Sequence, residues 1–352
     1  MHQAYAVYEG DTAIHEIEVE TPEATGRSVL LKVLRSGVCH TDTHLREGGY
    51  DLGSRGTMSL TDRGVPYPLV MGHEVVGEVT AVGDEVQDVR VGQRMLVYPW
   101  IGCGECRMCR EGRDNACAAG KNLGVARHGG YAETLWVPDA KYLVDIGDLD
   151  PSWTATLACS GITAYSAVDQ VLPLDEEESV VVIGAGGLGL TAIALLSARG
   201  HRTVVAVDRS EKNLELARQM GASATVVSDD DVAAALKEAL GGGAAAVIDF
   251  VNNGATATLG FDSLAKAGQM VQVGLFGGEV TLPNALLSLK MIRISGSFVG
   301  TLQQMKDLVQ IARTTDLPKI PIIERQLSAE QVAASLDDLT AGTVSGRVVL
   351  TA

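Results

Sequence analysis

The stretch VVVIGAGGLG, residues 180–189, decides the fold class of this chain. Its first four residues form a continuous apolar run, which is typical of a strand buried on both faces of a parallel sheet. A glycine-rich turn follows directly, and residues 190–199 then show a helical pattern that stops at Gly200. Strand, turn and helix in this order predict one unit of a doubly wound α/β fold.

The placement of the glycine motif makes it specific, although a GxGxxG motif alone is weak in a chain with 40 glycines. The next strand, predicted at residues 203–207, ends in Asp208, about 20 residues beyond the last glycine. Such glycines let the backbone approach a pyrophosphate, and a carboxylate there accepts hydrogen bonds from ribose hydroxyls. Asp208 would repel a 2′-phosphate, which favours NAD over NADP, whereas Arg209 can hold such a phosphate, cover the adenine or lie in solvent. The predicted dinucleotide contacts are Gly184, Gly186, Gly187, Leu188, Gly189, Asp208 and Arg209.

Strands and helices alternate on both sides of this unit. Before it, residues 153–168 have a helical pattern. After it come predicted helices at residues 211–220 and 229–240 and predicted strands at residues 225–227, 246–250, 269–273 and 292–299. Six strands joined by crossover helices make a doubly wound parallel sheet.

The N-terminal part of the chain has a different pattern. Short alternating apolar runs are separated by Gly, Pro and Asp, which predicts a small irregular β-barrel. These runs occupy residues 4–8, 14–19, 28–34, 75–82 and 94–97. The C-terminal residues return to a mixed pattern, with helices predicted at 303–313 and 329–339 and a strand at 346–350. We expect them to rejoin this first domain.

Residues 39–44, Cys-His-Thr-Asp-Thr-His, gather metal ligands and proton-transfer groups in six positions. A thiolate, imidazoles, hydroxyls and a carboxylate so close together are the materials of a catalytic metal site. For a lone cysteine the simpler interpretation is a small buried hydrophobe. Here His73 with Glu74, and the isolated Cys159, supply the further ligands that a zinc ion needs. We therefore predict that folding brings these segments to Cys39.

A second cysteine group is compact in the sequence. Its members are separated by two, two and seven residues and are Cys103, Cys106, Cys109 and Cys117. Four thiolates in this arrangement satisfy a tetrahedral zinc ion and leave no position for a substrate. The spacing predicts a structural site rather than four incidental thiols, and with Cys39 and Cys159 it accounts for all six cysteines.

The composition narrows the class of protein. A chain of 352 residues is long enough for two domains, and 46% hydrophobic with 20% charged residues is typical of a globular protein. A net charge of −16 without a Lys/Arg cluster argues against nucleic acid and anionic membranes as partners. No apolar run is long enough to span a bilayer, and no basic stretch precedes an apolar one at the N-terminus. We expect a cytoplasmic protein that is not attached to a membrane.

Residues 48–68, between two of the candidate ligands, are polar and rich in glycine. We interpret them as a long loop. Such loops are most often variable surface. Because this one connects the segment around Cys39 to His73, it could instead form a rim of the active-site entrance.

Together these motifs resemble the alcohol dehydrogenase type of the zinc-dependent medium-chain dehydrogenase/reductase superfamily. The resemblance covers essentially the whole chain and rests on residues 39–44, Gly72-His73-Glu74, the clustered cysteines, Cys159 with Thr163, the glycine turn with Asp208, and Gly346-Arg347. It implies a GroES-like catalytic domain at residues 1–155 and 300–352, interrupted by a Rossmann NAD-binding domain at residues 156–299.

The resemblance also implies roles for individual residues. Cys39, His73 and Cys159 would hold the catalytic zinc, Glu74 would be an occasional ligand, and Asp42 would order His73 from behind. His40 and Arg347 would face the pyrophosphate, and Thr163 the nicotinamide. Trp100 would be a wall of the pocket, unless it is simply a core residue. Asn213 stands where the family often has a lysine against the adenosine ribose, and residues 48–68 look longer than the loop of short-loop relatives.

A proton relay is implied as well. Thr41 would hydrogen-bond the zinc-bound alcohol, and His44 would pass its proton outward. The chemistry agrees, because zinc with three protein ligands makes a bound alcohol a far stronger acid, and an imidazole carries protons at neutral pH. His44 could otherwise be a surface histidine on a helix, and a neutral His40 contributes less to pyrophosphate binding than an arginine would.

The expected reaction is reversible NAD-dependent oxidation of a small-molecule alcohol to an aldehyde or ketone, with two zinc ions per chain. The alternative is a polyol or sugar dehydrogenase of the same superfamily. Cys159 speaks against it, because by resemblance those enzymes commonly have a carboxylate there. A zinc-stapled binding module without turnover would have no use for Thr41 and His44. By resemblance we also expect a homo-oligomer, a dimer or a tetramer, formed at the sheet edge near residues 292–297.

Overall fold

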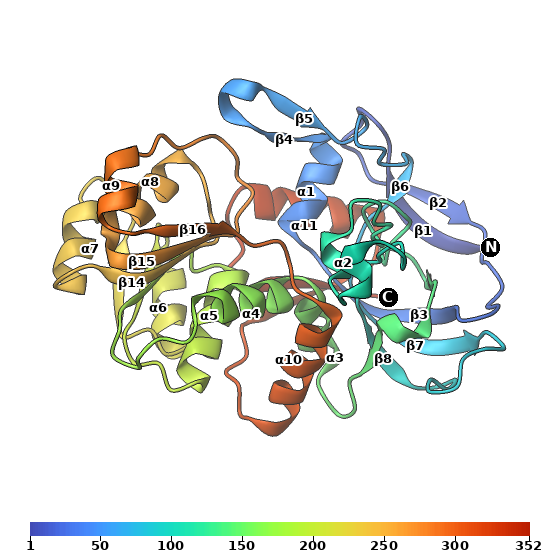
Figure 1. Cartoon of the computed structure of the whole chain (residues 1–352). Helices are drawn as coiled ribbons and strands as arrows, with labels where there is room; N and C mark the ends of the chain where they lie inside the picture. The colour runs from blue at the N-terminus through green and yellow to red at the C-terminus, as the bar shows by residue number, and fades with distance from the viewer.

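The computed structural model describes residues 1–352, which form two lobes side by side (Figure 1). One lobe is built on a parallel six-stranded sheet with the strand order β13-β12-β11-β14-β15-β16. Its strands are β11 (Val180–Ile183), β12 (Val204–Asp208), β13 (Ala224–Val227), β14 (Ala244–Asp249), β15 (Leu264–Gln272) and β16 (Arg293–Gly296). The order reverses at β11, which confirms the predicted doubly wound sheet.

Helices cover both faces of this sheet. Val180 and Val182 of β11 pack in the same core cluster as residues of α4 (Ser160–Val171), α5 (Gly187–Ala198) and α6 (Glu211–Gln219). Val181 and Ile183 point the other way, toward α7 (Val232–Leu240), α8 (Gly254–Ser263) and α9 (Asn284–Leu289). The alternation of side chains along a buried strand therefore explains why β11 is apolar throughout. No helix of the structure combines the length and apolar character needed to cross a membrane.

The other lobe is built on antiparallel strands. A seven-stranded sheet has the order β10-β8-β7-β3-β18-β17, with β9 also paired to β3, and a smaller sheet has the order β2-β1-β6. The strands are β1 (His2–Val7), β2 (His15–Val19), β3 (Val29–Gly37), β6 (Leu69–Val70), β7 (Glu74–Val82), β8 (Arg94–Val97), β9 (Thr134–Val137), β10 (Leu143–Asp145), β17 (Ile322–Gln326) and β18 (Arg347–Thr351). β18 pairs with β3, so the C-terminal strand returns to the N-terminal sheet.

The helices of this lobe are α1 (His40–Glu47), α2 (Arg107–Arg110), α3 (Pro151–Ala155) and α11 (Ala329–Thr340). Helix α10 (Leu302–Thr314) packs against α4 of the sheet lobe. One core cluster of 56 buried residues runs through both lobes and includes Cys39, Trp100 and Cys159. The candidate metal site therefore lies where the two lobes share a core.

The continuous helix predicted at residues 153–168 is wrong. The chain forms α3, then a 3₁₀ turn at Thr156–Ala158, and Cys159 lies outside both helices with φ −128° and ψ −70° before α4 begins. The apolar and small residues at 156–162 continue the helical pattern across this break, which explains the error. The break turns the Cys159 side chain toward Cys39.

The interpretation of residues 48–68 as a plain loop is also wrong. β4 (Gly49–Asp51) and β5 (Thr57–Ser59) form an antiparallel hairpin, with Tyr50 opposite Met58. Gly53 and Gly56 adopt positive φ angles of 65° and 81° in the connection, a conformation that glycine allows without strain. The hairpin stands over the gap between the lobes (Figure 1).

Candidate metal centre and dinucleotide cleft

Three distant segments bring Cys39, His73 and Cys159 together. Cys39 is the residue before α1, His73 precedes β7, and Cys159 occupies the break before α4. Their ligand atoms all lie within 4.8 Å of one another, and all three side chains are buried. Folding thus brings these three residues, here called the triad, to one place.

The triad fits a zinc ion. Its two sulfur atoms are 3.9 Å apart, far beyond a disulfide bond. Two thiolates bound tetrahedrally to one zinc, each at about 2.3 Å, would be about 3.8 Å apart. His73 Nε2 is buried and has no hydrogen-bond partner, as expected of a nitrogen kept for a metal. Three protein ligands leave a fourth position open, which is the arrangement of a catalytic rather than a structural zinc.

Asp42 fixes the triad from behind. It accepts hydrogen bonds from the Cys39 backbone N–H at 3.0 Å and from the Tyr131 hydroxyl at 2.8 Å, and His73 Nδ1 lies 3.2 Å from its carboxylate. A proton on Nδ1 leaves the lone pair on Nε2 for a metal. The sequence indicated Asp42 but not Tyr131, because nothing near Tyr131 in the chain marks it as a partner of residue 42.

The environment of the triad shifts the pKa values of its thiols in opposite directions. A hydrogen bond from Cys159 and the neighbouring His73 lower the pKa of the Cys39 thiol well below its ordinary value, against the opposing effect of burial. The hydrogen bond with Cys39 and burial raise the pKa of Cys159. The thiolate, which is the form that ligates zinc, is therefore favoured at Cys39 over Cys159.

Glu74 lies beside the triad but outside it. Its carboxylate accepts a hydrogen bond from the Ser160 N–H at 3.1 Å and forms a buried ion pair with Arg347. Burial raises the pKa of Glu74 to about 7, against the opposing effect of Arg347. Arg347 also donates to the Val38 carbonyl, and its aliphatic stem lies where a side chain on Gly187 would have to be. Arg347 thus connects Glu74 to the glycine turn.

Helix α1 presents the proposed relay. Thr41 and His44 are three residues apart, so they share one face of the helix. The His44 ring packs against Tyr50 with a centroid distance of 4.6 Å, and burial lowers the pKa of its imidazole. The His40 ring lies 5.2 Å from Phe276, which belongs to the other lobe, and burial lowers its pKa too.

The glycine turn has the close approaches that its sequence predicts. Gly184 has a φ of 88°, and a Cβ atom on Gly189 would lie only 1.9 Å from the Gly184 carbonyl oxygen. Asp208 lies beside this turn, where it accepts hydrogen bonds from the N–H groups of Ala185 at 2.7 Å and Ser210 at 2.8 Å. Arg209 makes no ion pair. The first turn of α5 and the carboxylate of Asp208 thus lie on the same edge of the sheet.

Thr163 lies in the first turn of α4. It is buried, and its N–H donates to the Cys159 carbonyl at 2.9 Å. Thr163 therefore lies one helical turn beyond Cys159 of the triad.

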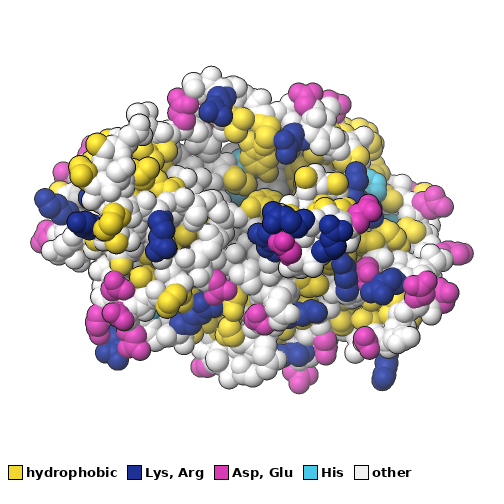
Figure 2. Space-filling model, in the orientation of Figure 1, with side chains coloured by type: hydrophobic (Ala, Val, Ile, Leu, Met, Phe, Trp, Pro, Cys, Tyr) yellow, Lys and Arg dark blue, Asp and Glu magenta, His cyan; other side chains and the backbone are white.

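A cavity of about 640 Å³ opens between the lobes, below the hairpin (Figure 2). Tyr50 and Met58 line it from the hairpin, Asn115 from the segment of the clustered cysteines, and Gln272 and Phe298 from the sheet lobe. Residues of the 48–68 segment therefore form part of the rim of this cavity.

The hairpin tip bridges to the opposite lobe. The backbone N–H and the hydroxyl of Ser54 donate to Glu279 at 3.3 and 2.7 Å. Trp100 is not part of the cavity lining. It is buried, and its ring contacts both His73 and Phe298, with centroid distances of 5.7 and 5.4 Å. Trp100 therefore packs against both His73 of the triad and Phe298 of the cavity lining.

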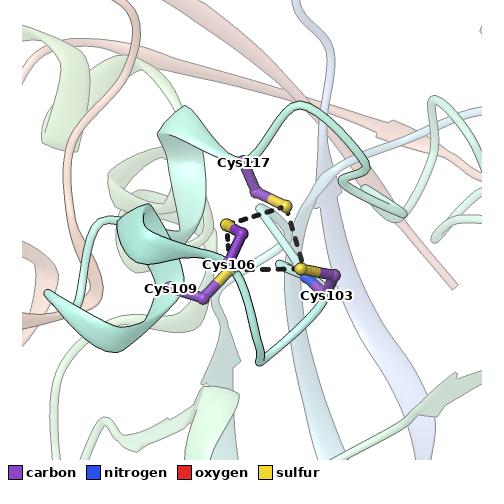
Figure 3. A group of neighbouring side chains, drawn as sticks. All are labelled: Cys103, Cys106, Cys109 and Cys117. Carbon is purple, nitrogen blue, oxygen red and sulfur yellow. Dashed lines mark hydrogen bonds between the residues drawn. The ribbon is translucent and has the colours of Figure 1, made fainter.

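The second cysteine group is half-exposed and close to tetrahedral. Figure 3 shows its four side chains pointing toward a common centre. The sulfur of Cys109 is 3.9 Å from that of Cys103 and 3.5 Å from that of Cys106, and Cys106 is 3.8 Å from Cys117. These are the edges expected around one zinc ion, again about 3.8 Å. Backbone N–H groups of Glu105 and Cys106 lower the pKa of Cys103 to about 7, whereas burial raises that of Cys109 to about 12.

Comparison with known proteins gives the family. Residues 25–148 match the alcohol dehydrogenase GroES-like domain, and residues 187–314 match the zinc-binding dehydrogenase family. The chain is 38% identical to the NAD-dependent alcohol dehydrogenase of Sulfolobus acidocaldarius, over 95% of this chain and 94% of that protein. The chain belongs to the zinc-type medium-chain dehydrogenase/reductase superfamily.

Two further members of the superfamily show its breadth. The crystal structure of the alcohol dehydrogenase of Aeropyrum pernix has a TM-score of 0.90 and 29% sequence identity, covering 99% of this chain and 100% of that one. The D-arabinose 1-dehydrogenase (NADP(+)) of Saccharolobus solfataricus is 30% identical over 95% of this chain and 93% of that protein. The relatives of this chain therefore include both alcohol and sugar dehydrogenases.

One anchor of this dehydrogenase was not found from the sequence. Asp114, inside the cysteine-rich segment, is buried and accepts a hydrogen bond from the Tyr142 hydroxyl at 2.8 Å, with Lys141 Nζ at 3.7 Å. An aspartate among four cysteines resembles an ordinary surface charge in the sequence. Only the return of residues 140–145 to the same place reveals its partners.

Proposed function

We propose that this protein is a zinc-dependent oxidoreductase that transfers a hydride between an alcohol and NAD, converting alcohols reversibly to aldehydes or ketones. The observation that carries the proposal is the triad: three buried side chains able to ligate zinc, one fewer than a tetrahedral ion takes, next to α1 and at the junction of the two lobes. The alcohol dehydrogenase relatives support the same reaction.

The chain's own residues would divide the chemistry. A zinc ion held by Cys39, His73 and Cys159 would act as a Lewis acid on the alcohol oxygen. Thr41 would hydrogen-bond that oxygen, and His44, whose lowered pKa keeps it neutral at pH 7, would accept the proton and release it to water. Asp42 would hold His73 in the ligating tautomer. Glu74, paired with Arg347, would remain beside the metal and serve only as an occasional ligand.

NAD would lie along the glycine turn and supply the hydride acceptor. The turn at Gly184–Gly189, with Leu188, would face the pyrophosphate together with His40 and Arg347, whose Nε is buried and without a partner. Thr163 would lie on the nicotinamide side. Asp208 would accept hydrogen bonds from the adenosine ribose, which favours NAD, while Arg209 would lie over the adenine or in solvent.

We further propose a second, structural zinc held by Cys103, Cys106, Cys109 and Cys117. All four positions are filled by sulfur, so no substrate could reach this ion. Its role would be to fix the segment that carries Asn115, a wall of the cavity.

We also propose that the protein forms a homo-oligomer through β16. This strand is the free edge of the six-stranded sheet and is largely exposed. An unpaired edge of this kind is a ready site for pairing with a second copy. Light scattering of the purified protein would give the number of copies.

A polyol or sugar dehydrogenase is the second candidate, favoured by the D-arabinose 1-dehydrogenase relative. One assay separates the two. Purified protein and NAD are offered matched primary, secondary, benzylic and polyhydroxylated alcohols, and NADH is followed by its absorbance. Turnover of simple or aromatic alcohols supports the first proposal, and turnover of polyols alone supports the second. No NADH from any alcohol, with both metal sites filled, would refute both.

A further inference from the structure

Tyr50 is the one aromatic side chain on the hairpin. It lines the cavity of about 640 Å³. Its hydroxyl makes no hydrogen bond to the protein and is not sealed off from the cavity. A phenol that reaches a ligand cavity with its hydroxyl free is available to a ligand.

Other tyrosines around the site use their hydroxyls within the protein. Tyr67 donates to the Leu45 carbonyl at 2.6 Å, Tyr98 to the Gly300 carbonyl at 2.8 Å and Tyr131 to Asp42 at 2.8 Å. Each of these bonds fixes one segment of the fold. Tyr50 differs from them because nothing in the chain satisfies its hydroxyl.

The position of the Tyr50 ring is nevertheless fixed. The hairpin pairs Tyr50 with Met58, and the ring packs at 42° to the His44 imidazole with a centroid distance of 4.6 Å. The hydroxyl is therefore held in place by contacts of the ring and not by bonds of its own. A polar group positioned in this way can orient a substrate without a large loss of side-chain entropy.

The contact with His44 places Tyr50 beside the helix that begins directly after Cys39. Burial raises the pKa of Tyr50, and so do the negative charges of Cys39, Asp42 and Cys159. The phenol is therefore neutral at pH 7. It offers a hydrogen-bond donor and acceptor beside the proposed relay.

We propose that the Tyr50 hydroxyl binds a second oxygen on the substrate, so that the enzyme favours alcohols with a neighbouring hydroxyl or carbonyl, such as 1,2-diols and α-hydroxy ketones. A monofunctional alcohol would displace water from the hydroxyl and leave it without a partner, which costs binding energy. Sites built to hydrogen-bond a substrate hydroxyl discriminate strongly against analogues without it. This inference rests on the proposed alcohol dehydrogenase function.

The test compares 1,2-propanediol with 1-propanol, which differ only in the second hydroxyl. Tyr50→Phe removes the hydroxyl and keeps the ring against His44. We expect the ratio of kcat/KM for the diol to that for 1-propanol to fall about tenfold in this variant, the loss of one hydrogen bond made in the transition state. Tyr67→Phe is the matched control, because it removes a hydroxyl that is already bonded to Leu45, and it should leave the ratio unchanged.

The outcomes separate this inference from the proposed function. If wild-type protein forms NADH from both alcohols but Tyr50→Phe leaves the ratio unchanged, the inference is wrong and the function stands. An equal fall for both alcohols would likewise overturn it, because the phenol would then act only through His44. If wild-type protein with filled metal sites forms no NADH from any alcohol of the full panel, the proposed function fails and this inference fails with it.

Discussion

The two cysteine clusters fit the same ion and are built in opposite ways. The quartet comes from one segment, residues 103–117, and lies half-exposed on its own turns. The triad comes from residues 39, 73 and 159, is buried, and depends on both lobes. Asp42 and Tyr131 order the triad, whereas backbone N–H groups serve the quartet. A local cluster can stabilise a loop, but an open position in a shared core is what catalysis requires.

The largest expected effect is loss of turnover without loss of the fold. Cys39→Ser removes one of the two sulfur ligands of the triad and leaves the quartet intact. We expect alcohol oxidation to fall about a thousandfold, since metal polarisation of the substrate contributes several kcal/mol. Bound zinc, measured by atomic absorption, should fall from two ions per chain to one. A variant that retains both activity and two zinc ions would show that the triad does not hold a catalytic zinc.

The second-largest effect should come from the proton relay, whose loss should lower activity without loss of zinc. His44→Gln should lower alcohol oxidation about a hundredfold at pH 7, the usual contribution of a general base. Burial lowers the pKa of His44 below the ordinary histidine value of about 6.5. The wild-type imidazole is therefore neutral at pH 7 and takes up a proton only at more acidic pH.

The pH–rate profile checks this assignment. Wild-type kcat should be level above neutral pH and fall on the acidic side as His44 becomes protonated. In His44→Gln that acidic limb should disappear, while zinc content stays unchanged. An identical profile in the two proteins would show that the proton leaves by another route.

Asp42→Asn should lower the zinc affinity of the triad and leave that of the quartet unchanged. The amide keeps the size of the side chain but weakens the bond that holds His73 in its ligating tautomer. Loss of such a partner commonly costs about 10- to 100-fold in metal affinity. Titration with a chelator should then remove one zinc per chain earlier than in the wild type, with the second unaffected. Simultaneous release of both ions would contradict independent sites.

The smallest effect should come from the anchor of the quartet segment. Asp114→Asn weakens the buried hydrogen bond from Tyr142 and the attraction of Lys141. We expect the free energy of unfolding to fall by about 1–2 kcal/mol, measured by urea denaturation followed by fluorescence. Activity should change little, because Asp114 touches neither the triad nor the cavity.

The contrast also explains what the sequence could predict. The quartet can be predicted from residue spacing alone, because its ligands are neighbours in the chain. The glycine turn and Asp208 can be predicted in the same way, since strand, turn and helix are local patterns. In both cases the structure has the elements where the pattern indicates them.

Features that depend on long-range contacts were not predictable in the same way. The break before Cys159 runs against a continuous helical pattern, and only its contact with Cys39, 120 positions away, explains it. Tyr131 donates a hydrogen bond to Asp42 across 89 positions, and Arg347 pairs with Glu74 across 273 positions. The hairpin at residues 49–59 was missed because its strands are only three residues each and lack an alternating apolar pattern.

The position of Cys159 also has a mechanical consequence. Helix α4, which it precedes, packs on the six-stranded sheet, whereas Cys39 follows a strand of the other lobe. The two sulfur atoms therefore lie inside a core that both lobes share. On the hairpin side the lobes are joined by the exposed hydrogen bonds from Ser54 to Glu279, which cost little to break. The arrangement of the metal ligands is thus fixed by buried packing and does not depend on the contact at the hairpin tip.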